Sequence, residues 1–308
     1  MPPSHRSNPG LSSGPPRYPG TFMLAFREAL AEMKWKAKRW LGDAVECVDE
    51  QGEEHVVGLE NLYRRARPEQ RETWPAIIAD FLQRIHAAEK AAQIEVKLAD
   101  VADQLMLRIG PSMMAVAGKL KVWSRPLEGT PLFVNLVIDQ PDTMSYVTEE
   151  MMAASELPAD HWHEQALANL LKRTSPGNLE VVHAESGLSL CSTGDAYDAT
   201  RSLLVETLRP NMPDAGCLLA VPSRDELLVL PLTAEALPHV HLMKLLAEKN
   251  YRSAPYSVSD EVFWVRQGRW QPFPMTIRGE EIMVRPPEEF LTFFPKPGDD
   301  AKSDGAAE

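Results

Sequence analysis

The sequence lacks the features that mark several common classes of protein. Its 308 residues include only three cysteines, which are Cys47, Cys191 and Cys217, and no C-x-x-C pair occurs. An odd number of widely separated cysteines argues against a disulfide framework or a cysteine-ligated zinc ion, and predicts buried, reduced thiols. No apolar run approaches the ~20 residues that a membrane-spanning helix needs, and no apolar segment follows a basic start. We therefore expect a cytoplasmic protein without a membrane span or a secretory signal.

Common catalytic and nucleotide-binding motifs are also missing. The sequence has no G-x-G-x-x-G and no P-loop pattern, so it offers no familiar nucleotide site. Its G-x-S-x-G match, at residues 10–14, lies in the proline-rich start of the chain and not between a strand and a helix, so no serine nucleophile elbow is indicated. Two His-x-His pairs, at 161–163 and 239–241, fall at the starts of predicted helices, where residues two apart point away from each other. We expect no cofactor and no metal site, and interpret these histidines as solvated or capping residues.

Positive charge is scarce. The chain carries 32 lysines and arginines against 44 aspartates and glutamates, a formal net charge of -12. Because binding to a phosphate backbone usually needs a basic face, we expect no nucleic-acid partner. One basic segment is a weak candidate for binding an acidic partner or a membrane surface, with internal pairing to the acidic residues that follow as the alternative. It comprises Lys34, Lys36, Lys38 and Arg39, next to Trp35 and Trp40.

Proline is abundant, and the 26 prolines indicate how the chain is organised. Residues 1–20 are rich in proline, glycine and serine, and residues 296–308 are similar in character, so we expect a disordered tail at each end. Between the tails we expect an N-terminal subdomain over 21–110 and a C-terminal subdomain over 111–295. The two could also form one domain, since domains commonly have ~100–200 residues.

Hydrophobic periodicity predicts about five main helices and many short strands. Helical spacing covers residues 21–41, 73–90, 160–173, 195–209 and 237–250, with a shorter stretch at 59–67. Strand-like runs bounded by turn residues cover 45–48, 55–59, 104–109, 132–138, 144–147, 179–184, 188–191, 217–221, 226–230, 261–265 and 269–271. Because tight turns join most neighbouring strands, antiparallel pairing should dominate. The predicted fold class is α+β rather than a doubly wound parallel sheet.

Several short motifs carry a family resemblance. In chain order they are V-x-G-L-E-N-L-Y at 56–63, V-I-D-x-P-D-T-M at 137–144, H-E-Q-A-x-A-N-L at 163–170, G-D-A-Y-D-A at 194–199 and A-V-P-S-R-D at 220–225. In this order the chain resembles the YtpQ-like proteins of bacteria, a family of unknown function, over residues 21–295. The resemblance implies a bacterial cytoplasmic protein and implies no activity. The first 20 residues are not part of the pattern.

Two polar motifs carry the candidate site. Asp195 and Asp198 stand at the start of a predicted helix, where they could bind a ligand or act as acid and base, although helix capping explains the same residue types and spacing. Arg224 and Asp225 stand at a hairpin tip between apolar strands. There a planar guanidinium could hold a carboxylate, a phosphate or a partner protein, with a salt bridge inside the turn as the alternative. The loop residues Asp139 and Asp142 are expected on the same side.

These residues leave two functions open. The favoured one is binding of an unidentified protein partner or small ligand, because no recognisable catalytic set is present. The alternative is an uncharacterised enzyme, such as a hydrolase, with these aspartates and Arg224 around one cleft. The ligand or enzyme interpretation gains if the start of the 195–209 helix and the Arg224 tip share one concave site. Tips more than ~15 Å apart would end the idea of a shared site, because that distance is far beyond hydrogen-bond reach.

Overall fold

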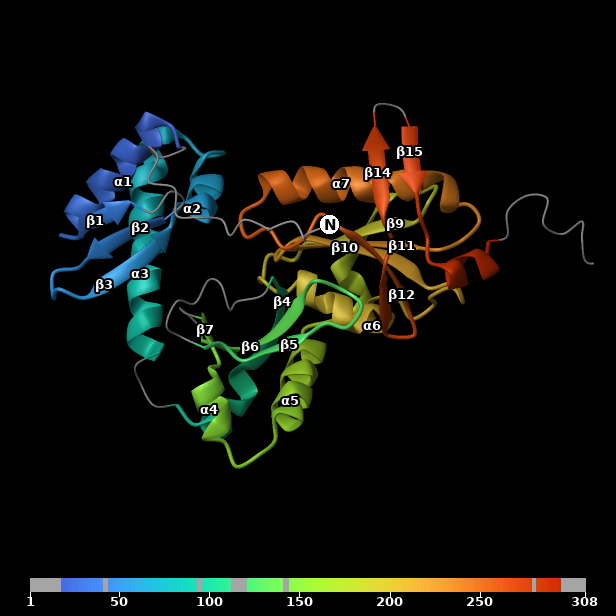
Figure 1. The fold of residues 1–308 in the computed structure, drawn as a ribbon, viewed down its shortest axis with the longest axis horizontal. Coiled ribbons are helices and arrows are strands. Elements are labelled where there is room, and N and C mark those ends of the chain that lie inside the picture. Colours follow the sequence, from blue (N-terminus) through green and yellow to red (C-terminus); the bar gives the residue numbers. More distant parts are fainter. Residues whose placement is uncertain are drawn as a thin grey trace, which may run out of the picture. The chain divides into compact units, whose positions relative to one another are not determined.

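The chain divides into two compact units that each have their own core. The computed structural model describes residues 18–40, 44–92, 96–111, 121–140, 144–278 and 281–294. The units are Met1–Ile94 and Glu95–Glu308, and the elements of the first are drawn in blue to cyan in Figure 1. Both units combine helices with antiparallel sheets, which confirms the predicted α+β class.

The division between the units lies at residue 94 rather than near 110. The reason is strand β4 (Leu105–Gly110), which pairs along its whole length with β6 (Phe133–Asp139) of the second unit. A strand that gives all its ladder hydrogen bonds to one sheet belongs to that sheet. Residues 95–110 therefore belong to the second unit.

The predicted tails fall almost wholly outside the described residues. Of the first tail only residues 18–20 are described. There Tyr18 is buried and its hydroxyl donates to Glu60, while helix α1 already begins at Gly20. These three residues therefore belong to the folded N-terminal unit. Among the described residues, no helix is both long enough and apolar enough to cross a membrane.

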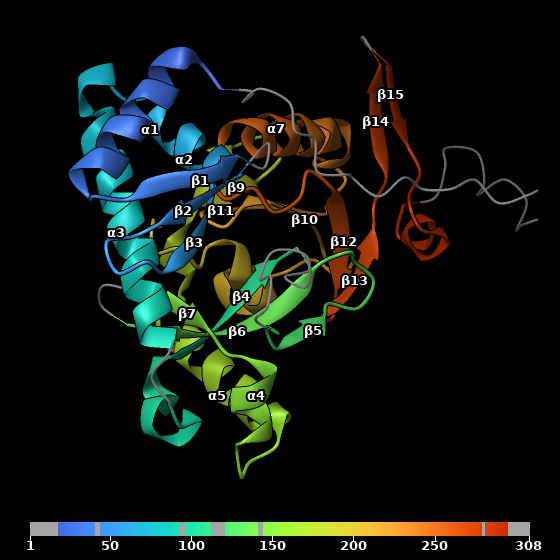
Figure 2. The same ribbon diagram turned by 60° about the vertical axis from the view of Figure 1, so that its left-hand side comes forward.

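The N-terminal unit packs helices against a small sheet (Figure 2). Its elements are α1 (Gly20–Glu32), β1 (Lys36–Trp40), β2 (Ala44–Val48), β3 (Glu54–Gly58), α2 (Leu59–Ala66), the 3-10 turn η1 (Arg71–Thr73) and α3 (Trp74–Ala92). The sheet is antiparallel in the order β1-β2-β3. In β3 burial alternates, so that His55 and Val57 face the core. The core also contains Phe22 and Phe26 of α1 and Leu82 of α3.

The predicted helix over 21–41 is wrong beyond Glu32. Lys34 has φ of 60°, a left-handed conformation that a regular α-helix does not contain. The chain then turns back, and residues 36–40 pair with β2 as strand β1. The helical spacing of apolar residues continued past Glu32, but the backbone hydrogen bonds offered by β2 decide the conformation.

The described strands of the C-terminal unit form two larger antiparallel sheets and one two-stranded hairpin. Its elements are η2 (Leu98–Gln104), β4, β5 (Ser124–Pro126), β6, β7 (Met144–Tyr146), α4 (Glu149–Ala153), α5 (Ala159–Lys172), η4 (Pro176–Asn178), β8 (Leu179–His183), β9 (Leu188–Cys191), η5 (Ala199–Leu204), α6 (Val205–Leu208), β10 (Cys217–Ser223), β11 (Glu226–Pro231), η6 (Leu237–His239), α7 (Val240–Ser253), β12 (Val262–Arg266), β13 (Arg269–Pro272), β14 (Met275–Arg278), β15 (Glu281–Val284) and η7 (Glu288–Thr292). The larger sheet has the order β13-β12-β10-β11-β9-β8, and in the smaller one β4, β5 and β7 all pair with β6. Strands β14 and β15 form a separate hairpin.

Strand β10 is buried along its whole length and lies between two hydrophobic cores. Cys217, Leu219 and Val221 join one core together with α5 and the smaller sheet. Leu218 and Ala220 point the other way and join a second core under α7. Because side chains alternate across a strand, one apolar run supplies both cores. Each fully buried leucine contributes about 1.5–3 kcal/mol to this packing.

The hairpins follow the predictions more closely than the helices do. The paired runs at 217–221 and 226–230 become β10 and β11, in the predicted antiparallel arrangement. The predicted helix over 195–209 is wrong as a single helix, because the non-helical backbone of Leu204 separates η5 from α6. Four consecutive residues of η5, Ala199–Ser202, are buried, so tertiary contacts set their conformation. The short elements α4, β5, β14 and β15 were not predicted, and the helices outnumber the expected five.

Candidate functional site

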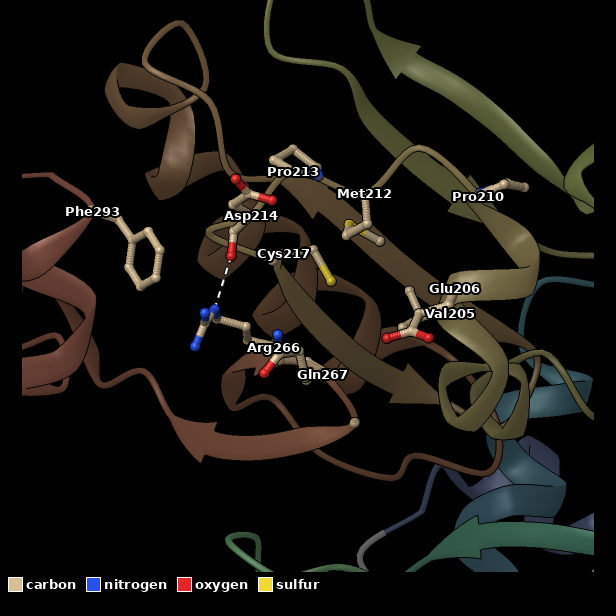
Figure 3. A pocket seen from close by; sticks show the side chains of 13 residues that line it. Val205, Glu206, Pro210, Met212, Pro213, Asp214, Cys217, Arg266, Gln267 and Phe293 are labelled. Carbon is tan, nitrogen blue, oxygen red and sulfur yellow. Dashed lines mark hydrogen bonds between the residues drawn. The ribbon is translucent and has the colours of Figure 1, made fainter.

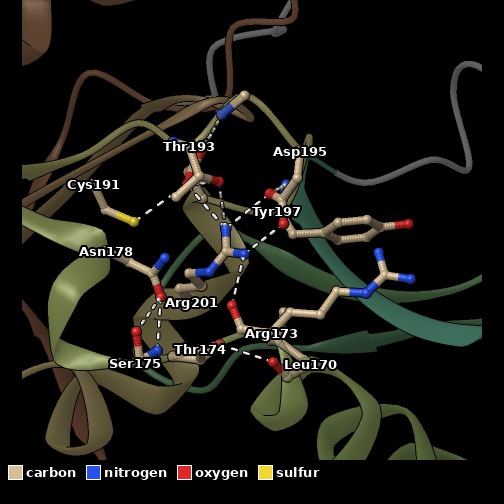
Figure 4. A network of polar contacts seen from close by, with 12 residues as sticks. Leu170, Arg173, Thr174, Ser175, Asn178, Cys191, Thr193, Asp195, Tyr197 and Arg201 are labelled. Carbon is tan, nitrogen blue, oxygen red and sulfur yellow. Dashed lines mark hydrogen bonds and ion pairs between the residues drawn. The ribbon is translucent and has the colours of Figure 1, made fainter.

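A buried arginine organises the loop that follows strand β9. Arg201 is 1% exposed, and its Nη1 donates to Thr193 Oγ1 at 3.1 Å, Asp195 Oδ1 at 2.8 Å and Asp198 Oδ1 at 2.9 Å. Its Nη2 donates to Asp195 Oδ2 at 2.5 Å and to the carbonyl oxygen of Arg173 at 3.1 Å. Figure 4 shows the guanidinium surrounded by these acceptors. One side chain therefore joins the loop at 193–198 to the end of helix α5.

The two predicted aspartates serve this network. Asp198 is fully buried and also accepts the backbone N–H groups of Thr193 at 3.0 Å and Gly194 at 3.2 Å. Asp195 Oδ1 accepts the backbone N–H of Tyr197. Although burial pushes the pKa of Asp195 upward, the hydrogen bond from Arg201 and the backbone N–H of Tyr197 hold it below its usual value. Neither residue caps a helix as expected: Asp198 precedes η5 without a side-chain cap bond.

The tip of the β10–β11 hairpin carries the predicted Arg224–Asp225 pair. Arg224 Nε donates to both carboxylate oxygens of Asp225 at 3.1 Å. Its guanidinium carbon lies 3.6 Å from the centre of the Tyr256 ring, so the charged plane stacks on the aromatic face. The backbone N–H of Arg224 donates to the carbonyl oxygen of Tyr256 at 3.1 Å. Tyr256 has φ of 57°, and the segment around it clamps the tip.

The structure brings the two predicted motifs into contact. The backbone N–H of Ala199 donates to the carbonyl oxygen of Arg224 at 3.1 Å. The carboxyl of Glu226 is affected by both motifs. Burial raises its pKa, and the charges of Asp225 and Asp198 raise it further, while a hydrogen bond with Asn250 offsets part of the rise. The start of η5 and the hairpin tip thus lie within hydrogen-bond reach, as a shared site requires.

Asp139 connects to the same network through one intermediate residue. Its Oδ2 accepts a hydrogen bond from Arg173 Nη1 at 2.9 Å, and the backbone oxygen of Arg173 accepts from Arg201. Burial first, and the charge of Asp139 second, raise the pKa of the Tyr197 hydroxyl. Asp142 lies outside the described residues, so its predicted placement beside Asp139 stays a prediction. Sequence reasoning missed Arg201, whose only signal is its position three residues after Asp198.

A hollow of about 430 Å³ lies elsewhere in the C-terminal unit (Figure 3). It is lined by parts of 205–217, by the β12–β13 turn and by Phe293. Arg266 on its wall donates through Nε to the carbonyl oxygen of Asp214 at 2.8 Å and through Nη1 to Glu289 at 3.1 Å. Its guanidinium carbon is 4.7 Å from the Phe293 ring centre. None of the predicted site residues lines this hollow, although its volume falls within the usual range for small-ligand sites.

The basic segment is arranged differently from the predicted helix face. Its residues lie on and beside strand β1 and form ion pairs with acidic residues of the neighbouring strands and turn, which are Lys34 with Glu50, Lys38 with Glu54 and Arg39 with Glu46. Trp35 is 6% exposed and stacks on His55, so it is not available to enter a membrane surface. Internal pairing, the alternative weighed for this segment, therefore describes three of its four basic residues.

Four of the described histidines lie in two groups of metal-ligating side chains. His183, Glu185 and His239 lie close together at the surface, and Asp49, His55 and His86 converge inside the N-terminal unit. Neither group contains both members of a His-x-His pair. The three cysteines are buried free thiols, as predicted. Burial raises the pKa of Cys47 to about 11 and that of Cys217 to about 12.

Comparisons with known proteins identified no relative of this chain. No family model, no curated protein and no solved structure was found to match this chain. What the protein does is therefore inferred from the geometry of its own residues.

Proposed function

We propose that this protein acts by binding, and that Arg224 of the C-terminal unit anchors an acidic group of its ligand. That group is a carboxylate or a phosphate, carried by a partner protein or by a small molecule. The observation that carries the proposal is the support of one arginine on two sides: Asp225 holds its Nε, and the Tyr256 ring lies under its plane. Among the described residues, Nη1 and Nη2 of Arg224 make no hydrogen bond.

The chemistry of a supported guanidinium favours this use. An arginine offers a planar fork that matches the two oxygens of a carboxylate or phosphate, and charge-assisted hydrogen bonds of this type contribute about 1.5–3 kcal/mol. A side chain already held in place loses less conformational freedom when the ligand arrives. The Arg224 side chain is 24% exposed, so its outer edge is accessible to solvent. Asp225 offsets part of the charge but occupies only the Nε side.

The alternative of a hydrolase has less support. A general acid or base must reach the substrate, whereas Asp198 is fully buried and both aspartates are hydrogen-bonded to Arg201. Their contacts order the 193–201 segment, which meets the hairpin tip through the backbone N–H of Ala199. The polar motif at 193–201 then positions the binding residue without touching the ligand.

Membership of the YtpQ-like family and a cytoplasmic location in bacteria belong to the same proposal. The motifs that carry the resemblance include 194–199 and 220–225, which are the two segments that meet at the candidate site. Three free, buried thiols suit a reducing compartment. Because the chain has a net charge of -12, it repels polyanions. A ligand with a single acidic group is therefore favoured over a polyanion.

Affinity purification from the native cell tests the proposal with three forms of the full chain. The first is wild type, the second Arg224→Ala and the third Arg252→Ala, which removes an exposed arginine on helix α7. We expect a captured protein or small acid that is lost from Arg224→Ala and kept by Arg252→Ala. Arg224→Lys should bind more weakly than wild type, because lysine keeps the charge without the planar fork. An identical set of bound molecules for wild type and Arg224→Ala would remove Arg224 from the function.

A second measurement separates the two kinds of ligand. A small acidic molecule in the eluate, added back to the purified chain, should raise its melting temperature in proportion to the logarithm of concentration. A protein ligand should instead form a complex that survives removal of small molecules by gel filtration. If neither behaviour depends on Arg224, the binding proposal at this tip fails.

A further inference from the structure

Three metal-ligating side chains converge inside the N-terminal unit, apart from the Arg224 site. Asp49 begins the turn after β2, His55 lies on β3, and His86 lies on helix α3. Asp49 Oδ2 is 3.2 Å from His55 Nε2 and 3.8 Å from His86 Nδ1. All three ligand atoms lie within 4.8 Å of one another. The geometry points to a binding site for one divalent transition-metal ion of the zinc type, held by Asp49, His55 and His86.

The separations between the ligand atoms fit a single ion. Zinc is bound by histidine nitrogen and carboxylate oxygen at about 2.0–2.2 Å. In a tetrahedral site these bond lengths place neighbouring ligand atoms about 3.3–3.5 Å apart. The distances of 3.2 Å and 3.8 Å from Asp49 Oδ2 lie on either side of this value. An ion would therefore require only small shifts of side chains that already face one another.

Two buried polar atoms of this cluster lack hydrogen-bond partners among the described residues. Asp49 Oδ2 and His86 Nδ1 are both buried, and neither makes a hydrogen bond with the described residues. The side chain of Asp49 is 1% exposed. Buried polar atoms are nearly always satisfied, since an unsatisfied one costs free energy. An ion at their meeting point would satisfy both atoms.

The loop fixes the direction of the carboxylate. Asp49 Oδ1 accepts the backbone N–H groups of Gln51 at 2.9 Å and Glu53 at 2.8 Å, so the turn holds one oxygen and leaves Oδ2 facing the histidines. A buried Asp49–His55 ion pair without metal is the simplest alternative. That pair would account for the 3.2 Å distance, but it does not explain why His86 brings a buried nitrogen to the same oxygen.

Aromatic packing orients the two imidazole rings. Trp35 stacks on His55 with ring centres 4.3 Å apart and an angle of 12° between the planes. The same indole meets His86 edge-on at 5.8 Å. Contacts that fix the ring orientation of a ligand are a regular part of metal sites. Trp35 thus acts as a positioning residue and lies close enough to report on the ion by its fluorescence.

The ligand set selects the class of metal. Two imidazoles and one carboxylate suit Zn²⁺, Co²⁺, Ni²⁺ or Fe²⁺, whereas Mg²⁺ and Ca²⁺ prefer shells made of oxygen. Three protein ligands leave one position of a tetrahedron for water or another small group. This metal site is distinct from the proposed ligand-binding site at Arg224. It lies in the N-terminal unit, whereas Arg224 lies in the C-terminal unit, and the two sites share no residue. It also departs from the sequence-based expectation of no metal site.

Zinc titration of the full chain tests the inference. The purified protein is stripped with a chelator, dialysed, and titrated with Zn²⁺ alone by calorimetry at neutral pH. We expect one equivalent per chain for wild type and at least tenfold weaker binding for His86→Ala. His86 is 23% exposed, so its loss should leave the fold intact, which circular dichroism will check. The matched control is His239→Ala, from the surface group in the C-terminal unit, which should keep the full equivalent.

Cobalt provides a second readout that a merely structural role would not produce. Co²⁺ bound by Asp49 and two histidines should give the visible absorption of a four-coordinate ion and quench Trp35 fluorescence. Asp49→Asn, which keeps the shape of the side chain, should lose the visible band, and Trp35→Phe should keep the band but lose the quenching. Failure of wild type to bind one equivalent overturns the inference. So does loss of that equivalent from His239→Ala, or its retention with unchanged affinity by both His86→Ala and Asp49→Asn.

Discussion

Replacing Arg201 with methionine tests whether the network around it holds the C-terminal unit together. The guanidinium is 1% exposed and contacts Asp195, Asp198, Thr193 and the carbonyl oxygen of Arg173. Methionine fills much of the same space without charge, so the variant leaves Asp198 fully buried beside no counter-charge. Removing one partner of a buried ion pair costs about 3–5 kcal/mol. We expect a loss of unfolding free energy within this range.

Scanning calorimetry of the full chain measures the effect. A domain of this size shifts its melting temperature by about 2–4 °C for each kcal/mol, so the transition of the C-terminal unit should fall by roughly 6–20 °C. The matched control is Arg173→Ala, which removes a half-exposed ion pair with Asp139 but keeps the backbone carbonyl, and should cost about 1 kcal/mol or less. A loss for Arg201→Met no larger than that of Arg173→Ala would refute the assignment of a structural network.

The same variant has a defined pH dependence. Burial raises the pKa of Asp195, but Arg201 and the backbone N–H of Tyr197 lower it more, so the net shift is downward. A carboxyl with a lowered pKa stabilises the fold above its unfolded pKa of about 3.9. That contribution is lost as the pH falls through the lower, folded pKa. The stability difference between wild type and Arg201→Met should therefore shrink below about pH 4.

Two further substitutions test particular contacts. Burial, together with the Asp225 and Asp198 carboxylates, raises the pKa of Glu226 more than its hydrogen bond with Asn250 lowers it, so its charge costs stability as the pH rises above about 4.3. Glu226→Gln should be more stable than wild type by about 1 kcal/mol at pH 7 in urea unfolding, with little difference at pH 4; no gain at pH 7 would contradict this. Gly216→Ala should cost at least about 2 kcal/mol, because Gly216 has φ of 75° and an added Cβ would lie 2.2 Å from the carbonyl oxygen of Val265. Gly268 has a similar φ of 72°, but an added Cβ there would have nothing within 4 Å. Gly268→Ala should therefore cost only about 1 kcal/mol of unfolding free energy. Equal losses for the two variants would show that the close approach to Val265 is unimportant.

Local patterns predicted the hairpins well for a physical reason. The β10–β11 pair combines two apolar runs with the turn residues 222–225, so neighbouring residues alone specify both the strands and their connection. The contact between Ala199 and Arg224 was suggested only as a possible shared site. Its formation depends on the larger sheet, whose strand order is not written in any local pattern.

The incorrect sequence-based predictions occur where contacts between residues far apart in the chain outweigh the local spacing of apolar residues. Helical periodicity continues past Glu32, but β1 pairs with β2 through backbone hydrogen bonds, so Trp35 does not lie on a helix and is buried against His55. From the sequence, helix capping was enough to explain Asp195 and Asp198. In the structure both side chains are instead hydrogen-bonded to the buried Arg201. The cluster of Asp49, His55 and His86 has no recognisable spacing, since its members come from a turn, a strand and a helix.

The double burial of β10 has a consequence for synthesis on the ribosome. Its neighbours in the sheet are β11, which follows after a two-residue turn, and β12, which begins at Val262. The hairpin can form early, but one edge of β10 and part of both its apolar faces stay uncovered until the residues of β12 have left the exit tunnel. At ~5–20 residues per second this interval lasts a few seconds. During that time a strand that is buried along its whole length in the folded unit is exposed to aggregation, so it is a segment that a chaperone could protect.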